Sequence, residues 1–252
     1  MYLKNYKIYI LNQNSNKSIY FLHLKNDLNE NLTIDYIDNK YQIFQRNEKN
    51  VKKIWIEFNS KKLNYRTNQK QKKEPLAKAV GIKKNYYPNI LDATAGFGTD
   101  AFILASLGCQ VLMLERNPIV AILLANGLDR GFKNKKIGKW LKKKLSLLYT
   151  SSEKFLIQTK TIPDVIYLDP MFPIIKKKAK SKKTINILKT IVKEQDNSNL
   201  LLNPARLLAK KRVVVKRPLH APFLNNVKTY SIIKTKKHRF DIYQPFNKEY
   251  NK

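Results

Sequence analysis

The sequence predicts an α/β fold: a seven-stranded, mostly parallel sheet with covering helices, preceded by a small β-rich N-terminal domain. Three observations favour this class. Beyond about residue 88, short apolar runs alternate with helix-forming stretches, which is the order of parallel β-α units. A glycine-rich turn joins the first of these runs to the first helix. Near the C-terminal end, two strand-like runs follow one another directly, which indicates an antiparallel hairpin that completes the sheet.

The elements of the larger domain follow from this alternation. Apolar runs of a few residues are assigned to strands, and longer stretches with helical periodicity are assigned to helices. We expect strands at residues 90–94, 110–115, 145–150, 164–169, 212–216, 228–235 and 239–243. We expect helices at residues 99–107, 117–131, 152–159 and 204–210, with a basic segment at 176–193.

The N-terminal part of the chain has a different composition. Residues 1–58 contain short runs rich in Tyr, Ile and Phe that predict strands, namely YKIYIL, SIYFLHL, LTIDYI, YQIFQ and KIWIEF. Residues 59–88 read as a basic linker with a short helix that begins at Pro75 and is closed by Gly81. We therefore divide the chain into a small β-rich domain (1–58), a linker with a helix (59–88) and the main α/β domain (89–252).

Charge is the strongest signal in the composition. The 252 residues include 50 Lys and Arg against 18 Asp and Glu, a formal net charge of +32. A field of this sign attracts polyanions, and nucleic acid is the usual partner. Only 8 of the 50 cations are Arg, and Lys, Asn, Ile and Tyr are abundant together, as in proteins from AT-rich genomes. Codon drift is therefore an alternative source of part of the charge.

Several classes of protein are disfavoured. The single cysteine, Cys109, excludes an internal disulfide and a cysteine-cluster metal site. The three histidines are scattered along the chain, so we expect no metal. No N-terminal signal peptide is visible, and no window approaches the roughly 18 apolar residues of a membrane span. We expect a cytoplasmic protein with no membrane partner.

The segment DATAGFGTD, residues 92–100, has the pattern of a nucleotide-binding turn. Gly96 and Gly98 let the backbone bend sharply and lie against a ligand. Glu115 ends the next strand and could accept hydrogen bonds from both ribose hydroxyls of a nucleoside. Asp92 could hold the glycine loop or an amino group of the cofactor. The same residues satisfy G-x-G-x-x-A, so a dinucleotide-binding enzyme remains a competing interpretation.

The segment YLDPMF, residues 167–172, discriminates between these interpretations. An exocyclic amine of a base is a poor nucleophile, and the Asp169 carboxylate beside the Pro170 turn could orient it towards a methyl donor. Phe172 offers an apolar face on which a base could stack. Parallel strands bring this turn and the glycine turn to one sheet edge. Together they favour methyl transfer from S-adenosylmethionine to a base.

Further residues of interest follow other strands. Ser151 and Ser152 come after the third strand, where they could cap the next helix and also contact an adenine ring. Cations near the same edge could contact RNA phosphates or be ordinary surface charge; they are Lys216, Arg217, His238 and Arg239.

In these residues and the segments around them, the chain resembles the bacterial ribosomal RNA small subunit methyltransferase J family. The matching segments are AKAVGI (77–82), DATAGFGTDAFILASLGC (92–109), LERNPIVAILLANGLDRG (114–131), YLDPMFP (167–173), PARLLAKKRVVVKRP (204–218) and KHRFDIY (237–243). They cover most of residues 75 to 243, whereas residues 1–58 show little likeness.

The resemblance implies a class I (Rossmann-like, seven-stranded) methyltransferase domain, S-adenosylmethionine as methyl donor, and the N2 amine of a guanine in 16S rRNA, naked or in the small ribosomal subunit, as acceptor. It places cofactor contacts on Thr99, Asp100, Glu115, Arg116, Ser151, Ser152 and Asp169. Thr99 stands where the family usually has Arg, and the segment 59–74 lacks the family's glycine-rich pattern. The alternatives are an adenine-N6 or protein-amide methyltransferase, or a non-catalytic rRNA-binding assembly factor.

Overall fold

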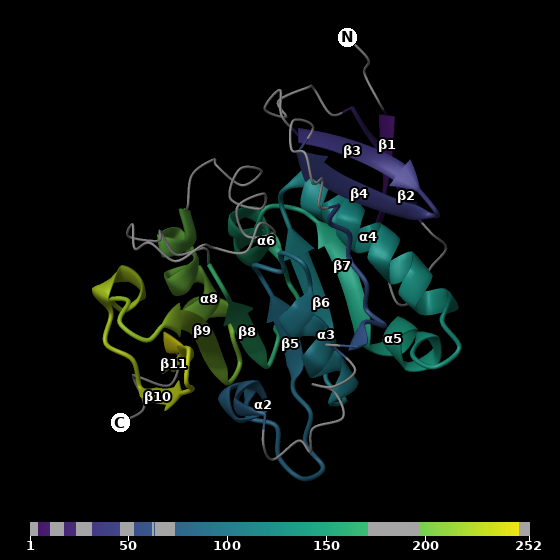
Figure 1. Cartoon of the computed structure of the whole chain (residues 1–252). Coiled ribbons are helices and arrows are strands. Elements are labelled where there is room, and N and C mark those ends of the chain that lie inside the picture. Colours follow the sequence, from purple (N-terminus) through teal and green to yellow (C-terminus); the bar gives the residue numbers. More distant parts are fainter. Residues whose placement is uncertain are drawn as a thin grey trace.

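A seven-stranded sheet forms the centre of the computed structural model (Figure 1). The structure describes residues 5–10, 18–23, 32–45, 53–61, 63, 74–170 and 197–246. In spatial order the strands are β10 (Ser231–Lys234), β11 (His238–Tyr243), β9 (Arg212–Pro218), β8 (Val165–Leu168), β5 (Asn89–Asp92), β6 (Gln110–Glu115) and β7 (Leu145–Tyr149). The five strands from β9 to β7 are parallel, and β11 and β10 complete the sheet as an antiparallel pair. The predicted fold class is confirmed.

The strands are apolar throughout because both faces of the sheet are buried. Alternate residues enter two separate hydrophobic clusters: Ile90 of β5 packs on one side and Leu91 on the other. The first cluster includes buried residues of α2 (Pro75–Val80), α3 (Thr99–Ser106), α4 (Pro118–Lys133) and α5 (Gly138–Lys144). The second includes residues of α6 (Ser152–Gln158) and α8 (Leu202–Leu208). Helices therefore cover both faces, as a doubly wound sheet requires.

Local sequence signals set where the helices begin and end. Asn117 caps α4, since its Oδ1 accepts hydrogen bonds from the backbone N–H groups of Ile119 and Val120, and Pro118 occupies the first helical position. Gly81 closes α2 in the left-handed conformation, with φ of 82°. Two short 3₁₀ helices, η2 (Asn197–Leu201) and η3 (Leu224–Asn226), flank α8 and β9 along the chain.

The N-terminal region contains two antiparallel hairpins, β1 (Asn5–Ile10) with β2 (Ser18–His23) and β3 (Leu32–Ile37) with β4 (Lys40–Gln45). The strand expected in KIWIEF is not formed: residues 53–58 make only a single antiparallel bridge, Ile43 to Ile54. Ile54, Ile56 and Phe58 pack instead into the cluster that contains α4. The described part of this region thus shares a core with the main domain, and a domain boundary at residue 58 stays a prediction.

Two other differences concern the main domain. Helix α5 was not expected, and the strand predicted over residues 228–235 is confined to β10. The basic segment 176–193 lies outside the described residues. Within the part of the chain that the structure describes, no helix combines the length and apolarity needed to cross a membrane.

Candidate active site

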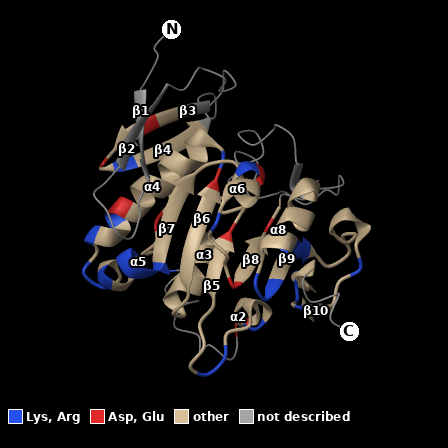
Figure 2. Cartoon of the chain, turned by 180° about the vertical axis from the view of Figure 1, so that it is seen from behind, with Lys and Arg blue, Asp and Glu red and all other residues tan. Residues whose placement is uncertain are grey.

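Acidic side chains gather at the carboxyl edge of the sheet. Asp92 and Glu115 are the last residues of β5 and β6, which are neighbours in the sheet, and Asp169 directly follows β8 on the other side of β5. In Figure 2 acidic positions lie at the ends of β5 and β6 in the middle of the sheet. The site therefore forms where open α/β sheets bind their ligands.

The glycine turn between β5 and α3 is built around two left-handed residues. Gly96 has a φ of 52° and Gly98 a φ of 67°, values that residues other than glycine rarely adopt. A Cβ on Gly98 would lie 2.8 Å from Leu124 Cδ2, so the turn packs closely on α4 there. Among the described residues, a Cβ on Gly96 would instead have only the Thr94 carbonyl oxygen, 4.0 Å away, as a neighbour. Gly96 therefore faces open space in which a ligand can lie against the backbone.

Glu115 ties this turn to the end of β6. Its Oε2 accepts a hydrogen bond from the backbone N–H of Gly96 at 3.0 Å, and its Oε1 accepts one from Asn117 at 2.7 Å. Burial raises the pKa of the Glu115 carboxyl to about 7, although these backbone hydrogen bonds oppose the rise. A carboxylate has about four lone-pair sites, so both oxygens retain capacity to accept from ribose hydroxyls.

Asp92 lies beneath the turn and is almost fully buried. Its Oδ1 accepts from the backbone N–H of Thr94 at 3.1 Å, and Thr94 Oγ1 accepts from the backbone N–H of Asp169. Burial raises the pKa of Asp92 to about 8, and the charges of Asp100 and Asp169 add to that rise. A cationic ligand at this edge would favour the ionised form of these acids.

A lysine connects the two halves of the site. Lys216 Nζ lies 2.7 Å from Asp100 Oδ2 and 2.7 Å from Asp169 Oδ2. Asp100, in the first turn of α3, also accepts a hydrogen bond from the buried Tyr167 hydroxyl at 2.8 Å. Burial raises the pKa of Asp169, and the Lys216 ammonium opposes that rise. Sequence reasoning singled out Lys216 as a possible phosphate contact, and its two carboxylate partners became visible only in the fold.

The loop after β7 closes another side of the site. Ser152 Oγ donates a hydrogen bond to the carbonyl of Ala93 in the glycine turn, and Ser151 caps α6 by accepting from the Lys154 backbone N–H. Arg116 Nη1 lies 3.5 Å from Glu153 Oε1, which links the end of β6 to α6. The structure thus brings the serines and Arg116 to the same edge as Glu115.

These residues fit a nucleoside cofactor that carries positive charge. The chain matches the family model described as "Putative SAM-dependent methyltransferase" over residues 18–245. A ribosomal RNA small subunit methyltransferase J from Buchnera aphidicola subsp. Schizaphis graminum is 48% identical over 247 residues, 96% of this chain and 99% of the relative. The chain belongs to the ribosomal RNA small subunit methyltransferase J family.

Other relatives agree with this assignment. The methyltransferase J of Pectobacterium atrosepticum is 55% identical over 172 residues, which cover 68% of this chain and 69% of that protein. A solved SAM-dependent methyltransferase from Neisseria gonorrhoeae is 32% identical and superposes with a TM-score of 0.66, covering 82% of this chain and 80% of that chain. Membership of this family removes the dinucleotide-binding alternative that the glycine pattern had left open.

Three of the predicted site residues need separate comment. Thr99 is the first residue of α3 and is half-buried beside Asp100 at the helix N-terminus. Pro170 is buried after Asp169, as expected of a turn that fixes the acid. Phe172 lies outside the described residues, so its stacking role in this methyltransferase J family member stays a prediction.

The four cations proposed as RNA contacts have different surroundings. Arg217 is buried and donates from Nε and Nη2 to the Pro222 carbonyl. Arg239 is buried against Asp241, 2.7 Å from Nε to Oδ1, and also donates to the carbonyls of Pro218 and Leu219. Both guanidinium groups hold the β9–β11 region together, so we leave them out of the RNA surface proposed below. His238 is half-buried at the start of β11, beside the end of β9.

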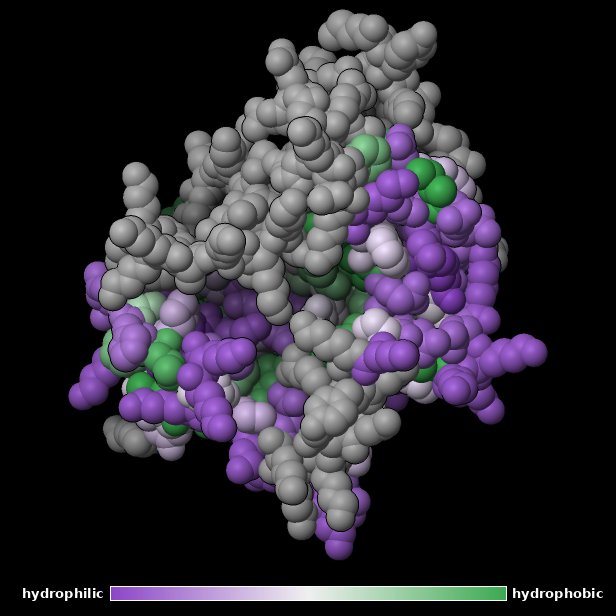
Figure 3. Space-filling view, in the orientation of Figure 1, coloured by the Kyte–Doolittle hydropathy of each residue, from purple (hydrophilic) through white to green (hydrophobic). Residues whose placement is uncertain are grey.

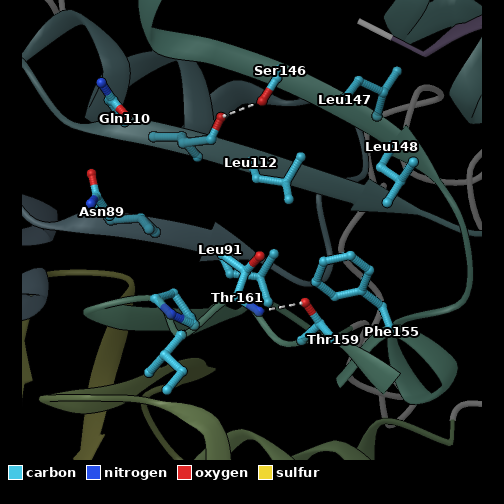
Figure 4. Close-up of a pocket in the computed structure, with 14 residues that line it drawn as sticks. Asn89, Leu91, Gln110, Leu112, Ser146, Leu147, Leu148, Phe155, Thr159 and Thr161 are labelled. Atoms are coloured by element: carbon cyan, nitrogen blue, oxygen red, sulfur yellow. Dashed lines mark hydrogen bonds between the residues drawn. The ribbon is translucent and has the colours of Figure 1, made fainter. Parts of the chain in front are cut away.

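A cavity of about 450 Å³ lies at the opposite edge of the sheet (Figure 4). Its lining includes Asn89 and Gln110, the first residues of β5 and β6, and Phe155 of α6. None of the described residues that line it is charged. Since the cofactor of this family carries a sulfonium and an ammonium group, the carboxylates at the other edge match it better than this apolar cavity does.

Proposed function

We propose that this chain transfers the methyl group of S-adenosylmethionine to the exocyclic N2 amine of a guanine in 16S rRNA. The observation that carries the proposal is the placement of Asp169 beside the glycine turn within a methyltransferase J fold. The relatives named above are small-subunit rRNA methyltransferases, and the net charge of +32 suits a polyanionic substrate. Since bacterial ribosomes are assembled in the cytoplasm, the proposal places the chain there.

On the donor side, Glu115 is assigned to the ribose hydroxyls and Ser151 and Ser152 to the adenine side of the cofactor. Gly96, with open space over its Cα, lets the backbone approach the ligand, and Asp92 and Asp100 supply negative charge for the methionine ammonium group. When bound, S-adenosylmethionine supplies a methyl group on a cationic sulfur. Transfer of that methyl group to the guanine amine would leave the electron pair of the C–S bond on sulfur and release one amine proton to solvent.

On the acceptor side, Asp169 accepts an N–H of the guanine amine and aims its nitrogen at the methyl group. The backbone N–H of Asp169 donates to Thr94 Oγ1, and Thr94 is itself tied to Asp92, so the acid sits on a fixed frame. Holding nitrogen and methyl in line removes much of the orientational cost of the reaction. Pro170 fixes the turn, and Phe172 is assigned to stack the base.

Cations that could contact RNA remain exposed near this edge. The hairpin between β10 and β11 presents Lys234, Lys236 and Lys237 to solvent, directly before His238. This hairpin lies at the carboxyl edge because β11 begins beside Pro218, the last residue of β9. We assign these lysines and His238 to phosphate contacts that position the rRNA, since such contacts fix the register of a nucleic acid on a protein.

The test is transfer of labelled methyl groups. The protein is incubated with methyl-labelled S-adenosylmethionine and, in separate reactions, with 16S RNA, 23S RNA and small ribosomal subunits. The proposal expects label in 16S RNA or in the subunit, and little in 23S RNA. Equal labelling of all RNAs, or labelling of protein alone, would contradict it.

A further inference from the structure

Lys216 occupies an unusual place for a lysine of a basic, RNA-modifying protein. It lies on β9 with only 24% of its side chain exposed, and its ammonium group contacts the Oδ2 atoms of Asp100 and Asp169 at 2.7 Å each. These partners come from two elements far apart in the sequence: Asp100 from the first turn of α3, and Asp169 from the end of β8. One ammonium group therefore joins the cofactor side of the site to the acceptor side.

The electrostatics explain why a cation is needed there. Asp100 and Asp169 share the Lys216 ammonium group, and the buried Asp92 lies close enough for its charge to act on theirs. Like charges this close strongly disfavour joint ionisation, and burial disfavours it further. Burial lowers the pKa of the Lys216 ammonium, but the Asp169 and Asp100 carboxylates outweigh this effect and hold its pKa above the ordinary value. Lys216 therefore stays charged and compensates part of the negative charge.

We propose that Lys216 is a positioning residue for methyl transfer: it holds Asp169 by Oδ2 and presents the second carboxylate oxygen to the guanine amine. The inference rests on the proposed function, because it assigns the acceptor role to Asp169. Oδ1 keeps two lone pairs with which to accept an N–H. The contact with Asp100 fixes the ammonium from the other side, so that the orientation of Asp169 depends on the position of α3. Lys216 thereby aligns the acceptor acid with the glycine turn.

This role differs from a phosphate contact, which the sequence position of Lys216 also suggested. The ammonium charge of Lys216 is already paired with the carboxylates of Asp100 and Asp169, so these three side chains together present no excess positive charge to RNA. A phosphate would have to displace Asp100 or Asp169 to reach the ammonium. A phosphate could reach the exposed lysines of the β10–β11 hairpin without displacing either of these acids.

Removal of Lys216 has a defined consequence for the pH profile. Among the described residues, the groups that act on Asp169 are Lys216 from β9, Asp100 from α3, Tyr167 from β8 and Asp92 from β5. Without the ammonium, burial and the Asp100 charge lose the lowering influence that opposes them, so the pKa of Asp169 rises. Since the ionised carboxylate is the stronger acceptor of the N–H, the acid limb of the methyl-transfer rate moves to higher pH.

The experiment compares Lys216→Met, Lys216→Arg and Lys211→Met in single-turnover assays with small-subunit RNA between pH 5.5 and 9.5. Lys211, just before β9, pairs with Asp164 at 3.7 Å on the far edge of the sheet and is a matched control. We expect Lys216→Met to lose at least about tenfold in rate at pH 7, with partial recovery at high pH. Lys216→Arg should keep the acid limb near its wild-type position, and Lys211→Met should behave as wild type. Should Lys216→Met fail to fold, Lys216→Gln removes the charge while keeping a hydrogen-bond donor.

Measurements of RNA binding distinguish the positioning role of Lys216 from a phosphate contact. The positioning role predicts that Lys216→Met keeps the wild-type RNA affinity and salt dependence, whereas a phosphate contact would reduce the salt slope by about one. A reduced slope with an unshifted pH profile would overturn the inference.

A failure of the proposed function would be recognised separately. If the wild-type protein methylates no rRNA, the substrate assignment fails. The carboxyl carbon of Asp169, titrated by ¹³C NMR in wild type and Lys216→Met, then still decides whether the ammonium holds this acid ionised. An unchanged titration would refute the positioning role.

Discussion

Glu115 combines a structural and a proposed cofactor role at one carboxylate. It accepts hydrogen bonds from the Gly96 and Asn117 backbone N–H groups, so the same side chain shapes the turn and faces the ligand site. Residues that hold their own binding loop are expected to be sensitive to substitution, because the loop and the ligand contact are lost together.

Replacement of Glu115 by Ala should therefore weaken S-adenosylmethionine binding at least tenfold, measured by isothermal calorimetry. The change removes two charge-assisted hydrogen bonds to the ribose, each worth about 1.5–3 kcal/mol. Asp129→Ala removes an equal charge from the outer face of α4 and is the control. An unchanged affinity in a folded Glu115→Ala protein would sink the ribose assignment.

Asp169 offers the sharpest test at the acceptor side. Asp169→Ala should leave RNA affinity nearly unchanged, because phosphate contacts dominate it, and should lower turnover by roughly 10²-fold or more. Asp169→Asn keeps an oxygen that can accept the amine N–H, so appreciable turnover should survive if hydrogen-bonded positioning is what matters. If Asn is as inactive as Ala, the negative charge is required. Near-normal turnover of Asp169→Ala would show that this residue only ends a strand.

At the scale of elements, the two glycines of the turn have different surroundings: Gly98 packs against α4, and Gly96 faces the space assigned to the ligand. Both Gly96 and Gly98 have positive φ, so an alanine at either position pays a left-handed backbone strain of about 1–2 kcal/mol. Only at Gly98 would the new Cβ also meet Leu124, at 2.8 Å, and overpacking of this kind adds roughly 1–3 kcal/mol.

We therefore expect Gly98→Ala to lower the free energy of unfolding more than Gly96→Ala in urea titrations. Gly96→Ala should in turn show the larger loss of S-adenosylmethionine affinity per unit of lost stability, because its Cβ projects into the open space assigned to the ligand. Equal losses of stability in the two variants, with unchanged cofactor affinity in Gly96→Ala, would contradict the assignment of that space.

Most strands of the sheet were predictable from the sequence because parallel strands are continuous apolar runs between glycine turns and helix caps. The prediction of elements was wrong where the spacing of apolar residues reflects tertiary packing and not the period of a helix or strand. Helix α5 (GKWLKKK) buries only Gly138 and Leu141, so its Lys-rich sequence shows no helical periodicity. In KIWIEF the alternating apolar residues looked like a strand, yet Ile56 packs on α4, where Gly127 leaves room for it.

The candidate site was predictable to the same extent. Strand-end acids and the glycine turn follow from chain position, since parallel strands bring their carboxyl ends to one edge. The partners of cations do not follow from position. Arg217 and Arg239 were indistinguishable from surface cations until the fold showed their buried partners, and Lys216 was paired with acids 47 and 116 residues away.

At the scale of the whole molecule, the excess charge is spread over the surface and not confined to the site. Basic positions gather on α5 and the end of α4 (Figure 2), and hydrophilic surface covers this side of the molecule in Figure 3. The exposed lysines there are Lys133, Lys135, Lys136, Lys139, Lys142 and Lys143. This patch precedes β7 and therefore lies towards the amino edge of the sheet, away from the β10–β11 hairpin.

If this field serves RNA binding, the logarithm of affinity for an RNA fragment should fall linearly and steeply with the logarithm of salt concentration. Each lysine that contacts a phosphate should reduce the slope by about one when it is replaced by Ala. Fluorescence anisotropy over a salt series would measure this, first in wild type and then in Lys236→Ala. A flat response between low and physiological salt would mean that the charge reflects codon usage.

The identity of the methylated nucleoside tests the central claim most directly. Small-subunit RNA methylated by the wild-type protein is digested to nucleosides, which are separated by chromatography and identified by mass against synthetic standards. Methyl transfer to the guanine N2 amine predicts N2-methylguanosine as the labelled product, formed at a rate lower by roughly 10²-fold or more when Asp169→Ala replaces the wild-type protein. N6-methyladenosine, or a label confined to another position of guanine, would contradict the account.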